Sequence, residues 1–379
     1  MALSTVRKFW PGILFLIWLS VQLFWWWRGG VRTGVDSALY IDQAHLIMDG
    51  QLPADRGIWY LGYSVFLALL FSAGFSLVGV VHVQVLVSAI AVVALYGISN
   101  RILEDERAAA LAALLYCLWP GVHEWNFFIY TESLFTSLSL ISIWALLQAG
   151  LRWKVIGGVL LLACVATRPT GFCLLAALAA MGLSQLNRSY PRGAWVAGGL
   201  AILAAVMLFN AFMQEATLPA RYAAAEVIYP MISWGIAPAE GIDTSGFSGP
   251  ALWDILKFSI TYTWYFLKLS GLKALLFIAH AKPYYSVLHN LAIVLFLLPV
   301  YVLAIRGYRL CANPAKLLVL VYFGVQTAVV ALTSENWDGR FLVPLLPWVF
   351  MLAGLGLSQA LPLRTFWLRQ KTASERPMV

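Results

Sequence analysis

Charged residues are scarce in this chain. Only 11% of its 379 residues are Asp, Glu, Lys or Arg, whereas soluble domains carry roughly 25%. Apolar residues make up 61% of the chain, and the mean hydropathy is +0.81. This composition excludes an ordinary soluble enzyme and predicts an all-α protein that crosses a membrane several times.

Paired cysteines and clustered histidines are also missing. The four cysteines stand singly, without a CxxC spacing, and the five histidines form no HxxxH pattern. A disulfide framework and a zinc site built from Cys or His are therefore not expected. The net charge of +8 comes from basic residues spread over short loops, which indicates membrane topology and not a nucleic-acid partner.

Two further features are absent from the sequence. No internal repeat at a fixed period is visible, which argues weakly against a transporter built from inverted repeats. The basic N-terminus, with Arg7 and Lys8, leads into an apolar run that has no small-residue cleavage site after it. We therefore predict a retained first span and not a removed signal peptide.

Long apolar runs, in contrast, are abundant. Two of them, which meet near Arg168, are short for a full crossing, and the apolar stretch 60–75 is predicted to be a re-entrant or surface helix. We expect about ten transmembrane helices in one domain covering 1–379. The segments that approach the roughly 20 residues of a bilayer crossing are 11–27, 77–99, 108–122, 130–150, 155–167, 170–186, 194–213, 287–305, 316–332 and 341–361.

The distribution of Lys and Arg predicts the orientation. With the N-terminus inside, most of the 25 basic residues fall in short inner loops or tails, as the positive-inside rule requires. We therefore predict a multi-pass protein of the cytoplasmic (inner) membrane with both termini in the cytoplasm. The first outer loop (28–76) and the long outer loop (214–286) are expected to carry surface helices on the outer, periplasmic face, without a separate soluble domain.

This topology places four polar regions on the outer face. Ionisable groups beside a membrane span are costly unless they lie in water or in a site, so these regions mark where the chemistry is expected. Their ionisable residues are Asp36 and Arg56 in the first outer loop, His123, Glu124 and Glu132 before the fourth span, Arg168 between the fifth and sixth spans, and Glu335, Asp338 and Arg340 in the last outer loop.

A carboxylate with arginines on one membrane face suits a reaction in which a hydroxyl loses its proton while a phosphate departs. The general base must lie within hydrogen-bond reach of the hydroxyl, and Asp36 is the candidate. A departing phosphate needs fixed positive charge, which a guanidinium supplies to two oxygens at once. The candidate phosphate ligands are Arg56, Arg168, Arg221 and Arg340.

The order of these motifs resembles the GT-C class of integral-membrane glycosyltransferases, which take sugars from polyprenyl-phosphate carriers. The first outer loop carries Asp36, Tyr40 and GYSVFLALL, and the pair Thr131 and Glu132 opens the fourth span. ATRPTG at 166–171 and DGRFLVPLLPW at 338–348 are similar to two further pieces of the class. The general likeness is to the branch with lipid A aminoarabinose transferases and protein O-mannosyltransferases. Ser37 departs from the second acidic residue that these relatives often carry.

The resemblance implies an inverting transfer of a sugar from a polyprenyl-phosphate donor to a hydroxyl acceptor, a lipid or a glycan in preference to a protein. Asp36 is then the base, and Arg56 is the first and Arg340 the second candidate for the donor phosphate. Glu132 is expected to contact the acceptor or sugar, or to help position a divalent cation in members that use one. The residues expected to line the substrate site are Tyr40, Tyr63, His123 and Glu335.

Each candidate also has a purely structural interpretation. Asp36 is a favoured helix N-cap residue type. Glu132 can cap its helix or pair with an arginine, and Arg168 can extend toward lipid headgroups from a helix end. Arg340 can form a local ion pair with Asp338 or Glu335.

Two other functions use the same charges. A transporter or flippase of a lipid-linked or anionic substrate predicts charges inside the spans and helices broken near the midplane. Here the ionisable groups collect on one face, which favours the enzyme. A polymerase or ligase of lipid-linked glycans shares the type of site and differs mainly in its donor. For the enzyme, we expect Asp36, Glu132 and one of Arg56 and Arg340 to line one outward cavity.

Overall fold

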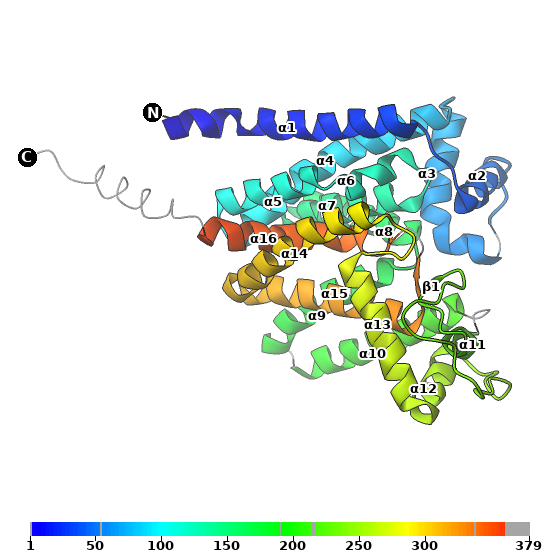
Figure 1. Cartoon of the computed structure of the whole chain (residues 1–379). Helices are drawn as coiled ribbons and strands as arrows, with labels where there is room; N and C mark the ends of the chain where they lie inside the picture. The colour runs from blue at the N-terminus through cyan, green and yellow to red at the C-terminus, as the bar shows by residue number, and fades with distance from the viewer. Residues whose placement is uncertain (1, 54, 190, 214–216, 337–338, 361–379) are drawn as a thin grey trace, which may run out of the picture.

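The protein is built almost wholly from helices (Figure 1). The computed structural model describes residues 2–53, 55–189, 191–213, 217–336 and 339–360. The all-α prediction is confirmed. The longest helices are α1 (Ala2–Gly29), α4 (Leu77–Leu103), α10 (Pro191–Phe212), α14 (Val287–Leu310) and α15 (Asn313–Leu332).

Every apolar segment predicted from the sequence falls on a helix, but not every such helix has the length of a membrane crossing. The helices α5 (Glu106–Leu118), α7 (Thr131–Leu147), α8 (Leu151–Thr167) and α9 (Gly171–Ser189) are shorter or only partly apolar. At 1.5 Å per residue, α7 covers about 26 Å of the roughly 30 Å hydrocarbon core. The chain thus has several helices of membrane-spanning length, and the count of ten is not confirmed. The six described stretches that qualify are Trp10–Gly29, Leu77–Leu103, Trp195–Phe212, Val287–Leu310, Asn313–Leu332 and Val343–Ala360.

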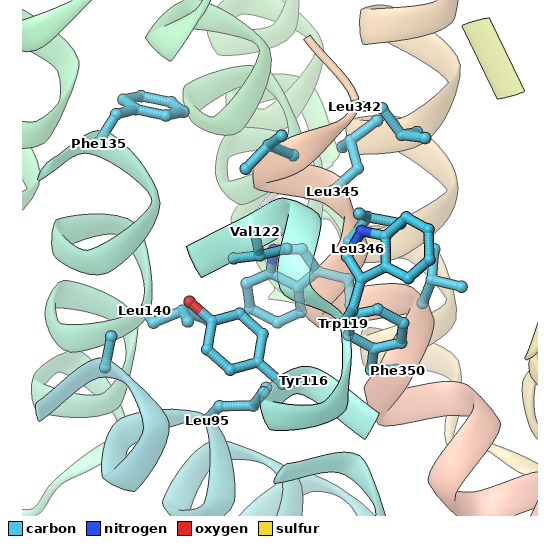
Figure 2. Close-up of a cluster of buried hydrophobic side chains, with 14 of the residues drawn as sticks. Leu95, Tyr116, Trp119, Val122, Phe135, Leu140, Leu342, Leu345, Leu346 and Phe350 are labelled. Carbon is cyan, nitrogen blue, oxygen red and sulfur yellow. The ribbon is translucent and has the colours of Figure 1, made fainter. Parts of the chain in front are cut away.

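The last helix, α16 (Leu346–Ala360), lies at the centre of the bundle and is buried over most of its length. It packs against α5 and α14 through small residues. A Cβ on Gly356 would overlap the backbone of Leu303 in α14, and a Cβ on Gly354 would overlap the backbone of Ala108 in α5. Glycines at these positions therefore let the helix backbones approach closely. Figure 2 shows part of the apolar core beside α16; the ring centres of Tyr116 in α5 and Phe350 in α16 are 6.5 Å apart.

Short helices gather at one end of the bundle. The first outer loop forms α2 (Val35–Met48), the 3-10 helix η1 (Asp55–Tyr60) and α3 (Leu61–Ser72). These lie at the end opposite the start of α1 and the end of α16 (Figure 1). The helix α2 ends before Gly50, whose φ of +75° favours glycine. Between α5 and α7 lie α6 (Pro120–His123) and η2 (Glu124–Phe127).

The long outer loop forms a second, smaller apolar core at the same end of the molecule. It contains α11 (Leu218–Ala223), β1 (Ile228–Tyr229), α12 (Ala251–Thr261) and α13 (Thr263–Ala279). The stretch 251–280 is divided into two helices, because the backbone leaves the helical region at Tyr262. There the Tyr262 ring packs on Phe258, inside the smaller core.

A parallel pair of two-residue strands joins the long outer loop to the last outer loop. Ile228 and Tyr229 of β1 pair with Glu335 and Asn336 of β2 (Glu335–Asn336). After β2 the chain passes Arg340 and enters η3 (Val343–Leu345), which leads directly into α16. The last outer loop is therefore held by the long loop on one side and by the central helix on the other.

The contact between α14 and α16 predicts the effect of one added methyl group. Gly356→Ala would push a Cβ into the backbone of α14 and is expected to lower the stability by about 1–3 kcal/mol. Gly324→Ala in α15 is the matched control, because a Cβ there meets nothing within 4 Å. Thermal unfolding of the purified proteins in detergent measures both. Equal unfolding temperatures for the two variants would contradict the close packing.

Candidate active site

The start of α2 explains the position of Asp36. Gly34 is the N-cap residue and Asp36 lies in the first turn, so the interpretation of Asp36 as the N-cap is wrong. The Ser37 hydroxyl accepts a hydrogen bond from the Gly34 N–H at 2.9 Å and donates one to the Ile129 carbonyl at 3.1 Å. Ser37 thus fixes the start of α2 against the segment between η2 and α7, which gives a structural reason for serine at this position. The carboxylate of Asp36 is stabilised by the positive end of the helix dipole.

Asp36 forms an ion pair with an arginine 304 positions away. The Nη2 atom of Arg340 donates to Oδ2 of Asp36 at 2.6 Å. The Asp36 side chain is 35% exposed and that of Arg340 is 12% exposed. The alternative of a local pair between Arg340 and Glu335 is wrong, since Glu335 pairs with Lys282. Asp338 lies outside the described residues.

Glu132 continues this contact inward. Its Oε1 atom lies 3.5 Å from Nε of Arg340 and 3.0 Å from Nη1 of Arg168. The Glu132 side chain is 1% exposed and that of Arg168 is 5% exposed, so Arg168 does not extend to headgroups. We call Asp36, Arg340, Glu132 and Arg168 the ion-pair chain. It runs from a partly exposed carboxylate to a fully enclosed guanidinium.

Aromatic rings surround the ion-pair chain. The guanidinium of Arg340 lies 5.1 Å from the ring centre of Tyr130, and that of Arg168 lies within 5.6 Å of Phe135 and Phe341. Such contacts stabilise a cation and exclude water, which strengthens electrostatic interactions among the charged groups. Burial opposes the charge on Arg340, but Glu132 and Asp36 outweigh it and raise the pKa of Arg340, so the residue stays a cation.

Tyr40 and Tyr60 complete this shell. Their rings lie 5.2 Å apart, and Tyr40 also packs against Tyr63 and Tyr130. Burial raises the pKa of both Tyr40 and Tyr60; the charges of Asp36 and Glu132 add to this shift and the guanidinium of Arg340 opposes it. Both phenols are therefore neutral hydrogen-bonding groups. Tyr60 was not among the predicted residues. Its only sequence signal is its place in the first outer loop, three residues before Tyr63.

Three buried atoms of the ion-pair chain have unused hydrogen-bonding capacity. Oε1 of Glu132, Nη1 of Arg168 and Nε of Arg340 are enclosed, yet within the described part of the chain none of them has a hydrogen-bond partner of good geometry. Buried polar atoms are normally hydrogen-bonded, so each exception calls for an explanation. Here the explanation is the ion pairs of Glu132 Oε1 with the two guanidinium nitrogens, at 3.0 and 3.5 Å.

The structure does not bring every predicted site residue to this chain. Tyr63 is enclosed in the core, where its hydroxyl donates to Gln84 at 2.9 Å. His123 is also enclosed, with its Nε2 atom 3.0 Å from the Tyr116 carbonyl, and burial lowers its pKa to about 4 against the opposing effect of that hydrogen bond. Packing encloses both side chains, and their expected place in a substrate site stays a prediction. Arg56 lies on the exposed surface of η1.

Arg221 and Glu335 belong to a second charged cluster, with Glu226 and Lys282, where the long outer loop meets the last outer loop. Arg221 lies 3.7 Å from Glu226 and over the ring of Tyr229, so it is part of this cluster and not of the ion-pair chain. Glu335 is fully buried and lies 3.7 Å from Nζ of Lys282, and its expected substrate-lining role stays a prediction. Burial raises the pKa of Glu335, and the ammonium of Lys282 opposes this shift.

The next features are a possible metal site and the cavity expected beside Asp36. Among the described residues, no three His, Cys, Asp or Glu side chains come together as ligands for a metal ion. A cavity of about 1460 Å³ lies at the opposite end of α4 and α5, away from the ion-pair chain, and is lined by residues such as Trp18 and Glu104. The expected outward cavity beside Asp36 stays a prediction.

The fold and site define an all-α protein with membrane-length helices and a buried ion-pair chain at one end of the bundle. Comparison of the chain with models of known protein families gives no match, and comparison with curated proteins gives none either.

The second cluster predicts an energetic coupling between Lys282 and Glu335. Lys282→Met leaves the enclosed Glu335 carboxylate without its cation and is expected to cost about 3–5 kcal/mol of stability. Adding Glu335→Gln removes the uncompensated charge and is expected to restore most of this loss. Thermal unfolding of the two single variants and the double variant gives the coupling. Losses that simply add would contradict the proposed pairing.

Proposed function

We propose that the protein is an inverting glycosyltransferase that moves a sugar from a polyprenyl-phosphate carrier to a hydroxyl acceptor, a lipid or a glycan. The observation that carries this proposal is the ion-pair chain, with a partly exposed carboxylate at its outer end and two guanidinium groups behind it. It lies at the end of a bundle of membrane-length helices, where a lipid-linked donor is available.

Asp36 has the exposure and position of a general base. Its partly exposed side chain can accept a proton from an acceptor hydroxyl that approaches from water. The hydroxyl oxygen then attacks the anomeric carbon, and the bond between that carbon and the phosphate oxygen breaks. The bonding electrons leave with the phosphate, so the configuration at the anomeric carbon inverts. Asp36 keeps the proton until product release.

Arg340 is the group best placed to hold the departing phosphate. It lies between the base and the buried Glu132, and its guanidinium can engage two phosphate oxygens at once. The enclosed Glu132 holds Arg340 from behind at 3.5 Å, and Arg168 in turn pairs with Glu132 at 3.0 Å. Fixed charge in a water-poor site is what stabilises a developing anion. The sequence analysis had Arg56 as the first candidate for the donor phosphate, and the geometry favours the second candidate, Arg340.

The distribution of charge along the helices favours chemistry at the surface over transport. The six helical stretches of membrane length contain no Asp or Glu. Their Lys and Arg residues lie near the ends, as Arg101 does in α4 and Lys316 in α15. A transport path near the midplane uses ionisable groups there. We propose that the site faces the outer side of the cytoplasmic membrane, as the distribution of basic residues predicts.

Replacement of the proposed base tests the enzymatic function. Asp36→Asn is expected to reduce kcat for transfer from a polyprenyl-phosphate sugar by about 10²–10⁴-fold, because the amide cannot take the proton. Asp49→Asn is the matched control, since Asp49 is exposed at the end of the same helix. Both are assayed in liposomes with radiolabelled lipid-linked sugars and a mixture of lipid and glycan acceptors.

An unchanged unfolding temperature shows that the Asp36 variant is folded. Transfer at the normal rate by the folded Asp36→Asn protein would contradict the role of Asp36. Passage of the intact labelled lipid across the membrane without release of polyprenyl phosphate would favour the transporter instead.

A further inference from the structure

The helices α12 and α13 of the long outer loop expose large apolar side chains. Trp253 is 59% and Ile260 is 78% exposed in α12, and Trp264 is 70% exposed in α13. Leu256 and Leu267 are exposed beside them, at helical spacing. The other side of both helices is buried in the smaller core. Exposed apolar residues gathered on one side of an element mark an interaction surface.

One short sequence produces this exposed side in both helices. The pattern Trp-x-x-Leu-Lys occurs at 253–257 in α12 and at 264–268 in α13, eleven residues apart. Eleven residues are about three helical turns, so the second copy returns to the side of the first. The Trp, Leu and Lys side chains of both copies are exposed in the structure. We call these six residues the Trp-Lys face.

The charge on the Trp-Lys face is positive. Lys257 and Lys268 are exposed, whereas Asp254, the one acidic residue of the two helices, is turned inward and accepts from a backbone N–H of the preceding loop. The third lysine of these helices differs, because Lys273 is enclosed and donates to the Thr333 carbonyl. Lys273 serves the fold, and the two exposed lysines are directed outward, where an anionic partner can meet them.

The contact with α10 places the Trp-Lys face near the headgroups of the membrane. The apolar stretch of α10, Trp195–Phe212, has 18 residues and covers about 27 Å, close to the roughly 30 Å hydrocarbon core. Near its end, the Asn210 side-chain oxygen accepts from the Leu252 N–H at 2.9 Å. The helix α12 therefore begins where α10 leaves the hydrocarbon core. Figure 1 shows α12 and α13 at the side of the bundle, with α12 against α10.

The composition of the face suits this depth. Neither α12 nor α13 is among the described stretches of membrane-spanning length, so the face lies on a leaflet and does not cross it. Tryptophan rings favour the headgroup region, and helices that lie there combine apolar side chains with lysines. Each lysine near a membrane surface also attracts anionic lipids.

We propose that the Trp-Lys face is a docking surface for the leaflet at this end of the bundle, with a preference for anionic phospholipids. The rings of Trp253 and Trp264 enter the headgroup region, and the ammonium groups of Lys257 and Lys268 meet lipid phosphates. This contact anchors the long outer loop to the bilayer beside the helices that cross it. The proposal does not depend on the glycosyltransferase function.

Photocrosslinking of the full chain tests the docking surface. Benzoylphenylalanine is introduced at position 260 between the two copies of the pattern, and in a control protein at position 51, where Gln51 is exposed after the end of α2. Both proteins are reconstituted in vesicles of three parts phosphatidylethanolamine to one part phosphatidylglycerol, irradiated and analysed by mass spectrometry. We expect at least tenfold more lipid adducts at position 260 than at position 51. The ratio of phosphatidylglycerol to phosphatidylethanolamine adducts at position 260 is expected to exceed the vesicle ratio about threefold.

Removal of the two charges gives the second measurement. With Lys257→Gln and Lys268→Gln together, the adduct ratio at position 260 is expected to fall to the vesicle ratio, while the total yield of lipid adducts stays similar. Lys316→Gln is the matched control, because Lys316 lies at the opposite end of the bundle, at the start of α15. It is expected to leave the ratio unchanged.

Three outcomes would overturn the proposal. An adduct ratio equal to the vesicle ratio in the unaltered protein would remove the preference for anionic lipids. A crosslink from position 260 to a second copy of the chain would replace the membrane surface by a protein interface. Equally few lipid adducts at positions 260 and 51 would show that the face lies in water.

Discussion

The guanidinium of Arg340 is the contact on which the rest of the site depends. It lies 2.6 Å from Asp36 and 3.5 Å from Glu132, and so joins the first outer loop to the start of α7. Without Arg340, the buried Glu132 would keep only its ion pair with Arg168 among the described residues. Asp36 would lose the cation that pairs with it. A buried carboxylate without enough positive charge is costly. The position of Arg340 therefore determines whether the proposed base and phosphate ligand act together.

Several elements hold the last outer loop so that Arg340 reaches this position. Before Arg340, β2 pairs with β1, Ser334 donates to Glu226 at 2.7 Å, and Glu335 pairs with the enclosed Lys282. After Arg340, the chain enters η3 and then α16, which is packed at Gly354 and Gly356 against α5 and α14. The second charged cluster thus supports the site by fixing the loop. It takes no direct part in the proposed chemistry.

The sequence was informative where a residue's environment is local. The apolar runs predicted the helices, and the position of Asp36 beside a span predicted a polar site. The partners of Asp36 were harder to predict, because Arg340 lies 304 positions away and only the packing of α16 brings it near. His123 and Glu335 looked accessible as loop residues, but both are fully enclosed by chain that is distant in sequence. The number of crossings also depends on how short helices such as α7 pack, which composition does not show.

The central claim is that Arg340 binds the phosphate of a lipid-linked donor beside Asp36. An experimental structure of the full protein with a bound short-chain polyprenyl phosphate tests it most directly. The account predicts phosphate oxygens about 2.7–2.9 Å from guanidinium nitrogens of Arg340, with the prenyl chain running between the adjacent helices. A phosphate bound at Arg221 in the second charged cluster would contradict it, and so would a phosphate bound in the cavity at the opposite end of α4 and α5.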